Sequence, residues 1–319
     1  MVLKNAGKSF CLKKTKTKQI KLNDYNTIKF YIKCIINIYL MYCLNLLLYV
    51  SRIFRLLCPL KYAKPKYYTN EYRSDSAIVP LIKPIVIEPT SIISWNINCI
   101  PLFISTKKVN EIIDTINNYM DADILCLQEC FDDKIIRKII KETKAKYWYH
   151  QTGNLQKPCV IGDSCGLLIL SKIPIKFINF TAFNNKGGIE YLANKGLMIC
   201  NIGNVNIVNT HLQSGDCNLS CSKINSIINA QIRQLKQCTI SNSTVFCGDF
   251  NTENLDKLFD ISLNNKISTV NEKYYNKNMC LDYIFTKDKT IEIDSNVIDL
   301  LENPSDHKPI LANIRIKHN

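Results

Sequence analysis

Residues 91–99 read SIISWNINC and residues 122–129 read ADILCLQE, and these two runs decide the fold of the chain. Both are short and rich in apolar residues, and both carry polar side chains toward their ends, which is typical of buried strands. Between them, apolar residues recur at the spacing of one helix face, at Val109, Ile112, Ile113 and Ile116. The region therefore predicts a strand, a helix and a second strand.

Strands and helices continue toward the C-terminus. A second helix face carries Ile135, Ile136, Ile139 and Ile140, and a further helix is predicted near residues 222–238. Further strands are predicted at residues 165–170, 175–182, 196–201, 204–210, 244–248, 282–286 and 308–316. Because strands outnumber helices, the expected fold class is α/β, as a four-layer α/β sandwich of two packed, mainly antiparallel sheets flanked by helices. The pattern disfavours a doubly wound parallel sheet.

The net charge of the chain is +14, but the excess lies at its beginning. Residues 1–70 contain 14 of the 41 Lys and Arg residues and a single acid, Asp24, whereas residues 71–319 contain 27 basic and 26 acidic residues. The near-neutral remainder lacks the basic excess of a domain that tracks nucleic-acid backbones. The high isoelectric point is therefore no argument for a nucleic-acid substrate.

Two segments at the start of the chain differ from the rest in composition. Residues 1–27 are lysine-rich and have no apolar periodicity, so we expect a disordered basic arm. Residues 28–58 are hydrophobic, and their centre at residues 34–51 reads CIINIYLMYCLNLLLYVS without a formal charge. This run is long enough to span a bilayer core. We therefore expect an N-terminal hydrophobic helix and a membrane-associated, single-pass protein.

Other interpretations of this hydrophobic segment stay open. Asn37 and Asn45 weaken a spanning helix, and the flanking tyrosines and basic residues also fit a helix in the membrane interface. A buried helix packed on the rest of the protein is a third possibility. Basic residues flank both ends, so the positive-inside rule does not set the orientation. Residues 59–89 hold five prolines and are predicted to be a linker, which leaves residues 90–319 as one folded domain.

The chain has 15 cysteines at irregular spacing. An odd number without a framework favours reduced thiols, and hence a folded domain in the cytosol. Cys217 and Cys221 form a close pair after His211 that could belong to a metal cluster. Nothing nearby in the sequence completes a four-ligand zinc set, so this interpretation is disfavoured.

Polar residues recur where the predicted strands end. They stand in the runs SWNIN, LQE, THLQ, GDFN, LDYIF and SDHKP, as Asn96, Gln128, Glu129, His211, Gln213, Asp249, Asn251, Asp282, Asp306 and His307. Carboxylate and amide oxygens are the ligands that Mg²⁺ prefers. Histidines add proton transfer or phosphate contact near neutral pH. The set predicts a magnesium site with acid–base groups.

The same six runs resemble, in kind and in order, the motifs of the endonuclease/exonuclease/phosphatase superfamily. The resemblance covers residues 90–319 and implies a four-layer α/β sandwich with its active site at one edge of the two sheets. It implies that residues 90–319 are the catalytic domain of a Mg²⁺-dependent phosphodiesterase. In such an enzyme, water attacks the phosphorus directly, without a covalent enzyme intermediate.

The resemblance also assigns roles to the matched positions. It makes Glu129 the principal metal ligand, with Asn96 nearby and Asp306 as a further ligand. His307 resembles the general base that activates water, and Asp282 the residue that orients its imidazole. The positions that would hold the phosphoryl oxygens are His211, Asp249 and Asn251.

Within the superfamily, further runs resemble the neutral sphingomyelinase-like branch. These are QECFDD at residues 128–133, CGLLILSKIPI at residues 165–175 and NKGLMIC at residues 194–200, together with THLQ. This resemblance implies a phospholipid head group as substrate, at a membrane. A nuclease and an inositol-phosphate phosphatase remain alternatives, with nucleic acid not favoured, as does a catalytically dead, membrane-tethered binding module. Asn154 or Asp163 lies where the family often adds a polar site residue, and the sequence does not choose between them.

Overall fold

The chain divides into two compact units, Met1–Leu60 and Lys61–Asn319, and the computed structural model describes residues of the second. The described residues are 66–68, 89–100, 104–143, 145–152, 164–188, 190, 193–215, 219–238, 243–262, 267–275 and 277–317. The predicted basic arm and hydrophobic segment lie outside these ranges, as do Asn154, Asp163 and Cys217. Within the ranges, no helix is long and apolar enough to cross a bilayer.

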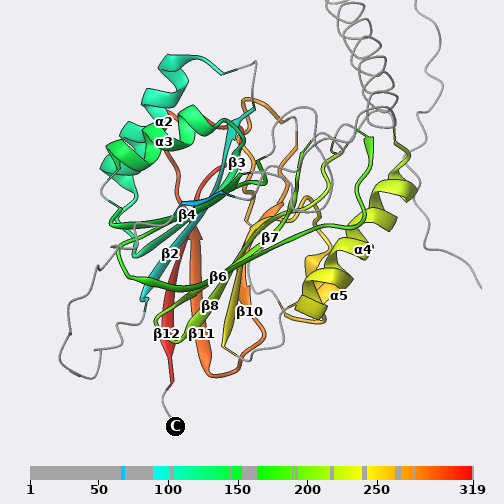
Figure 1. The fold of residues 1–319 in the computed structure, drawn as a ribbon. Coiled ribbons are helices and arrows are strands. Elements are labelled where there is room, and N and C mark those ends of the chain that lie inside the picture. Colours follow the sequence, from blue (N-terminus) through cyan, green and yellow to red (C-terminus); the bar gives the residue numbers. More distant parts are fainter. Residues whose placement is uncertain are drawn as a thin grey trace, which may run out of the picture. The chain divides into compact units, whose positions relative to one another are not determined.

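The described strands form two sheets, which Figure 1 shows packed against each other. The seven-stranded sheet has the order β1 (Lys66–Tyr68), β4 (Tyr147–Thr152), β5 (Gly166–Ser171), β3 (Ile124–Cys130), β2 (Ser91–Cys99), β12 (Ile310–Ile316) and β11 (Ile291–Val297). The five-stranded sheet has the order β10 (Asp282–Thr286), β9 (Thr244–Asp249), β8 (Val205–His211), β7 (Gly196–Ile202) and β6 (Ile175–Ala182).

Each sheet contains one parallel pair of strands. Strand β2 runs parallel to β3, and β8 runs parallel to β9, whereas the other described pairs are antiparallel. The expectation of mainly antiparallel sheets is therefore confirmed. Because the carboxyl ends of parallel strands meet at the same edge, each sheet gathers the residues that end its parallel pair.

Helices cover the outer faces of the two sheets (Figure 1). Helices α2 (Thr106–Tyr119) and α3 (Asp133–Glu142) pack on the seven-stranded sheet, while α4 (Cys221–Cys238) and α5 (Leu255–Phe259) pack on the five-stranded sheet. Side-chain oxygens cap the first two helices: Ser105 accepts from the amide of Lys108, and Asp132 accepts from the amides of Lys134 and Ile135. The layers are thus helices, sheet, sheet and helices.

Three apolar clusters hold these layers together. The central cluster lies between the sheets and joins residues of both, among them Ile92, Cys126, Cys200 and Cys247. A second cluster joins the seven-stranded sheet to α2 and α3, and a third joins the five-stranded sheet to α4 and α5. Strands that contribute to two clusters are apolar on both faces, which is why they read as continuous apolar runs in the sequence.

The structure departs from the sequence expectation in a few elements. Strand β1, at Lys66–Tyr68, lies inside the segment predicted to be a linker, and it pairs with β4 of the folded domain. Strands β4 and β11 and the short helix α5 were not predicted. The other predicted strands and the helix near residues 222–238 are present, with bounds that differ by two residues or fewer.

Candidate active site

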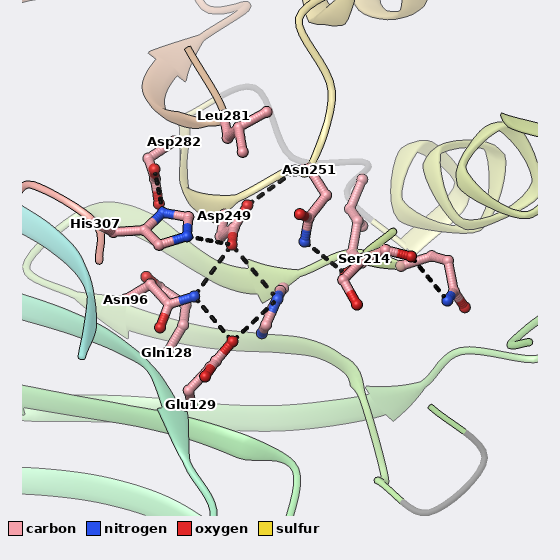
Figure 2. A network of polar contacts seen from close by, with 12 residues as sticks. Asn96, Gln128, Glu129, Ser214, Asp249, Asn251, Leu281, Asp282 and His307 are labelled. Atoms are coloured by element: carbon pink, nitrogen blue, oxygen red, sulfur yellow. Dashed lines mark hydrogen bonds and ion pairs between the residues drawn. The ribbon is translucent and has the colours of Figure 1, made fainter. Parts of the chain in front are cut away.

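The polar residues at the strand ends come together at one edge of the two sheets (Figure 2). Strands β2 and β3 bring Asn96 and Glu129, and strands β8 and β9 bring His211 and Asp249. All four lie near the carboxyl ends of the parallel pairs. The site is therefore built half from each sheet.

The side-chain amide of Asn96 links the two halves. Its Nδ2 donates to Glu129 Oε1 and to Asp249 Oδ2, at 3.1 Å in each case. His211 Nε2 lies 3.5 Å from Asp249 Oδ2 and 4.0 Å from Glu129 Oε1. One amide thus holds the two carboxylates in place, and the imidazole of His211 lies against both.

His307 stands on the other side of Asp249 (Figure 2). Its Nδ1 lies 2.7 Å from Asp282 Oδ2, and its Nε2 lies 3.7 Å from Asp249 Oδ2. The backbone around it is fixed, because His307 O accepts from Trp95 Nε1 and from Asn303 Nδ2, both at 2.9 Å. The imidazole is thereby held with one nitrogen on Asp282 and the other toward the site.

Asn251 and Asp306 complete the predicted set at its periphery. The amide nitrogen of Asn251 donates to Asp249 Oδ1 at 2.9 Å, and its side-chain Nδ2 donates to Leu212 O at 3.2 Å. Asp306 accepts a long hydrogen bond of 3.4 Å from the hydroxyl of Tyr275, a residue that the sequence did not single out. Its charge also acts on Glu129.

Three residues of the site have left-handed backbone conformations. The φ angles are 48° at Asn98, 60° at Glu129 and 49° at Asn251. A non-glycine residue at such an angle costs of the order of 1 kcal/mol and persists where the surrounding structure imposes it. A fourth such residue among those described, Asp260, is the C-cap of α5, whereas these three carry or adjoin the groups of the site.

Burial and crowding of like charges shift the ionisation of the carboxylates. Burial raises the pKa of Glu129, and the nearby Asp306 adds to the effect, whereas Lys195 and Asn96 oppose it. Burial, with the charge of Asp282, raises the pKa of Asp249 to about 7. Both carboxylates are therefore harder to ionise than they would be in water.

The two histidines shift in opposite directions. Burial is the main cause that holds the pKa of His211 well below its ordinary value, and the charge of Lys195 is the second. Burial also acts to lower the pKa of His307, but the carboxylates of Asp282 and Asp249 outweigh it and raise that pKa to about 10. His211 is therefore a neutral imidazole, and His307 holds a proton at neutral pH in the metal-free site.

A buried ion pair that the sequence did not assign to the site lies against His211. Lys195 Nζ lies 2.6 Å from Glu190 Oε1, 3.0 Å from His211 Nε2 and 3.1 Å from Leu212 O. Lys195 and Glu190 are both about 5% exposed or less. The run NKGLMIC contains Lys195, but nothing local in that run indicates that its ammonium group reaches the site.

The donor set fits a divalent cation such as Mg²⁺. Glu129 Oε2 is buried and has no hydrogen-bond partner among the described residues, although it belongs to a carboxylate beside Asp306 and Asp249. A free carboxylate oxygen amid clustered acids is what a hard cation requires. Within the described ranges, one group of three ligand atoms lies within 4.8 Å of one another, from Asp249, Asp282 and His307.

This geometric group differs from the predicted ligands Glu129, Asn96 and Asp306. In it, His307 Nδ1 and Asp282 Oδ2 are already engaged with each other at 2.7 Å, as an oriented imidazole requires. We therefore favour Glu129 as the principal ligand. All eight predicted site residues lie in or beside one network, whereas Cys221 is an exposed free thiol and belongs to no metal cluster among the described residues.

Comparisons with known proteins agree with this geometry. The sequence profile of the Endonuclease/Exonuclease/phosphatase family matches residues 93–307. Sphingomyelin phosphodiesterase 5 from Danio rerio is 26% identical over 157 residues, which cover 42% of this chain. The matched part of the chain spans only 29% of that relative's length.

Solved structures share the fold at lower identity. A mutant beta toxin from Staphylococcus aureus with bound magnesium ions is 20% identical with a TM-score of 0.55, over 71% of this chain and 99% of that one. TDP2 from D. rerio complexed with a single-strand DNA product is 14% identical with a TM-score of 0.55, over 72% of this chain and all of that one. Since the family profile matches more than half of the chain and includes all eight predicted site residues, the chain belongs to the endonuclease/exonuclease/phosphatase family.

Proposed function

We propose that the chain is a magnesium-dependent phosphodiesterase that cleaves a phospholipid head group of the sphingomyelin type. The observation that carries the proposal is that two groups lie against Asp249. One is the partly buried carboxylate of Glu129, which has a free oxygen, and the other is the oriented imidazole of His307. The carboxylate of Glu129 suits a hard cation, and the imidazole of His307 suits proton transfer from water.

The residues of the chain have separate tasks in this reaction. In its neutral form, which a cation bound at Glu129 would favour by lowering the pKa of the imidazole, His307 accepts at Nε2 a proton from the attacking water. Asp282 holds the opposite nitrogen and stabilises the imidazolium that forms. The water oxygen forms the new bond to phosphorus as the bond to the leaving oxygen breaks. When bound at Glu129, with Asn96 and Asp306 beside it, Mg²⁺ would polarise a phosphoryl oxygen and offset its developing charge.

The remaining groups can stabilise the phosphoryl oxygens. His211 is held neutral, and the side-chain amide of Asn251 donates to the carbonyl of Leu212, the next residue in the chain. The ammonium group of Lys195 lies 3.0 Å from His211 Nε2 and adds positive charge beside the carboxylate of Glu129. Preorganised donors of this kind act where charge develops in the transition state.

The lipid substrate is supported by the similarity to sphingomyelin phosphodiesterase 5 and by the near-neutral charge of residues 71–319. A nuclease is the second candidate, because the fold is also that of TDP2 complexed with DNA. An inositol-phosphate phosphatase uses the same family chemistry. A dead binding module is disfavoured because all eight predicted site residues are present and lie in or beside one network.

We further propose that residues 28–58 attach the enzyme to a membrane and that the catalytic domain faces the cytosol. The uncharged run at residues 34–51 and its basic flanks support the attachment. Eight cysteines of the described part of the chain are free thiols. Free thiols are in keeping with a reducing compartment.

A substrate panel tests the proposal. Full-length protein would be given sphingomyelin, lysophospholipid, inositol phosphates, and single- and double-stranded DNA, with Mg²⁺ or with a chelator. We expect turnover of sphingomyelin that requires Mg²⁺ and is absent in Glu129→Gln. Preferential cleavage of DNA would replace the lipid with the nuclease candidate, and inactivity on every substrate would favour the binding module.

A further inference from the structure

Asn209 crosses the space between the two sheets directly beneath the site. It lies on β8 of the five-stranded sheet and is fully buried. Its Nδ2 donates to Leu127 O at 3.1 Å and to Leu168 O at 3.3 Å, on two strands of the opposite sheet. Its Oδ1 accepts from Gln128 Nε2 at 2.8 Å. One side chain thus makes three hydrogen bonds to the other sheet.

These hydrogen bonds fall where the pairing of β3 is irregular. Leu127 pairs with Leu168, but the next registered pair is Cys130 with Gly166, so β3 carries one more residue than β5 over this interval. The extra residue makes a β-bulge, which redirects a side chain and disturbs the ladder. Asn209 satisfies the carbonyls of the last regular pair before the bulge.

The bulge decides which way Glu129 points. Side chains of a regular strand alternate between its two faces. On β3, Cys126 faces the other sheet, whereas Leu125 and Leu127 face the helices α2 and α3. Regular alternation after Gln128, which faces Asn209, would turn Glu129 toward the helices. The φ of 60° at Glu129 breaks the alternation and brings its carboxylate to Asn96 and His211.

We propose that Asn209 is a positioning residue for the metal ligand Glu129. By holding Leu127 and Gln128 from the opposite sheet, it fixes the strand immediately before the bulge, and with it the left-handed turn at Glu129. Because Asn209 lies two residues before His211 on the same strand, it also sets the position of the carboxylate against the half of the site that β8 supplies. This inference rests on the proposed metal-dependent function.

The test is metal binding by the full-length protein without substrate, measured by calorimetry with Mg²⁺ and by electron paramagnetic resonance with Mn²⁺. Asn209→Leu keeps a similar volume and removes all three hydrogen bonds. We expect its metal affinity to fall about 10- to 100-fold, which is the usual effect of losing a residue that orients a ligand. The matched control is Thr210→Val, which removes a buried hydrogen bond of 3.0 Å to Gly196 O inside the five-stranded sheet.

The control separates positioning from general stability. Thr210→Val should lose stability yet bind metal as the wild type does, whereas equal affinity in Asn209→Leu and the wild type would overturn the proposal. If Asn209→Leu does not fold, Gln128→Leu decides. That variant removes the hydrogen bond to Asn209 Oδ1 together with those to Ser94 Oγ and Cys126 O. We expect metal binding several-fold weaker, while unchanged binding would equally overturn the proposal.

Glu129→Gln distinguishes failure of this inference from failure of the proposed function. If Glu129→Gln weakens metal binding and Asn209→Leu does not, then Glu129 is a ligand that needs no support from Asn209. If neither substitution affects metal binding, the assignment of Glu129 as ligand is itself wrong, and with it the metal site of the proposed function.

Discussion

His307 Nδ1 lies 2.7 Å from Asp282 Oδ2, and both side chains are almost entirely buried. The two residues come from different segments, since Asp282 begins β10 and His307 precedes β12. The contact fixes the orientation of the imidazole and favours its protonated form. Removing the charge of Asp282 while keeping its shape should therefore alter both the rate of the reaction and its dependence on pH.

Asp282→Asn should lower turnover less than His307→Ala does. The alanine variant loses the group that we propose as the acceptor of the proton of water, and we expect a loss of at least about 10²-fold. The asparagine variant keeps the base but loses the carboxylate that raises the pKa of His307. Its lower pKa should move the acidic limb of the pH–rate profile to lower pH. Steady-state kinetics across pH for both variants would measure this, and a limb that moves to higher pH would contradict it.

The stability of the metal-free protein should fall as pH rises from 7 to 9. The pKa of His307 is raised from 6.5 to about 10, so its contribution to stability is fully present below 6.5 and is lost as pH rises through 10. Melting temperatures in the presence of a chelator would follow this loss. The His307→Ala variant should show a flatter dependence over the same range, and equal slopes in the two proteins would exclude His307 as the cause.

Glu129→Gln should stabilise the metal-free protein and remove its response to metal. Burial raises the pKa of Glu129, which means that the folded state holds this carboxylate at a cost. A neutral amide of the same shape avoids that cost. We expect a higher melting temperature than the wild type in chelator, and little further increase on adding Mg²⁺. If Mg²⁺ raised the melting temperature of Glu129→Gln as much as that of the wild type, the cation would bind elsewhere.

Deleting residues 1–60 should release the enzyme from membranes without affecting its chemistry on a soluble phosphodiester. The cut at the boundary between the two compact units keeps β1, which pairs with β4 in the catalytic domain. Fractionation in alkaline carbonate separates the alternatives for full-length protein, because a spanning helix stays in the pellet and an interfacial helix is extracted. Full-length protein in the soluble fraction at ordinary salt would contradict membrane attachment.

The strands that the sequence indicated most directly are those buried on both faces. Strands β5 and β9 are buried at every residue, so their composition alone identifies them. Strand β11 lies at a sheet edge, and its residues alternate between exposed and partly buried positions, as the run IEIDSNV shows. Half of its side chains need not be apolar, which is why the sequence indicated it weakly. The three-residue strand β1 is shorter than any pattern can identify.

The site was predictable where its residues end parallel strands. Asn96, Glu129 and Asp249 stand at the edge to which chain direction alone assigns them. The position of Lys195 depends instead on the pairing of β7 with β8, which brings the start of one strand beside the end of the other. Its partner Glu190 lies in the connection before β7. No local pattern reports that arrangement, so sequence reasoning missed the pair.

The left-handed backbone at Asn98, Glu129 and Asn251 has a consequence for how the protein would respond to selection. Glycine adopts such angles without steric cost, so each position offers a route to greater heat resistance. The side chains of Glu129 and Asn251 belong to the network of the site, so glycine at either position would raise stability but lower catalytic activity. A screen for thermostability should therefore accumulate glycine at Asn98 first, while a screen for turnover should retain all three residues and leave the enzyme less stable than its fold permits.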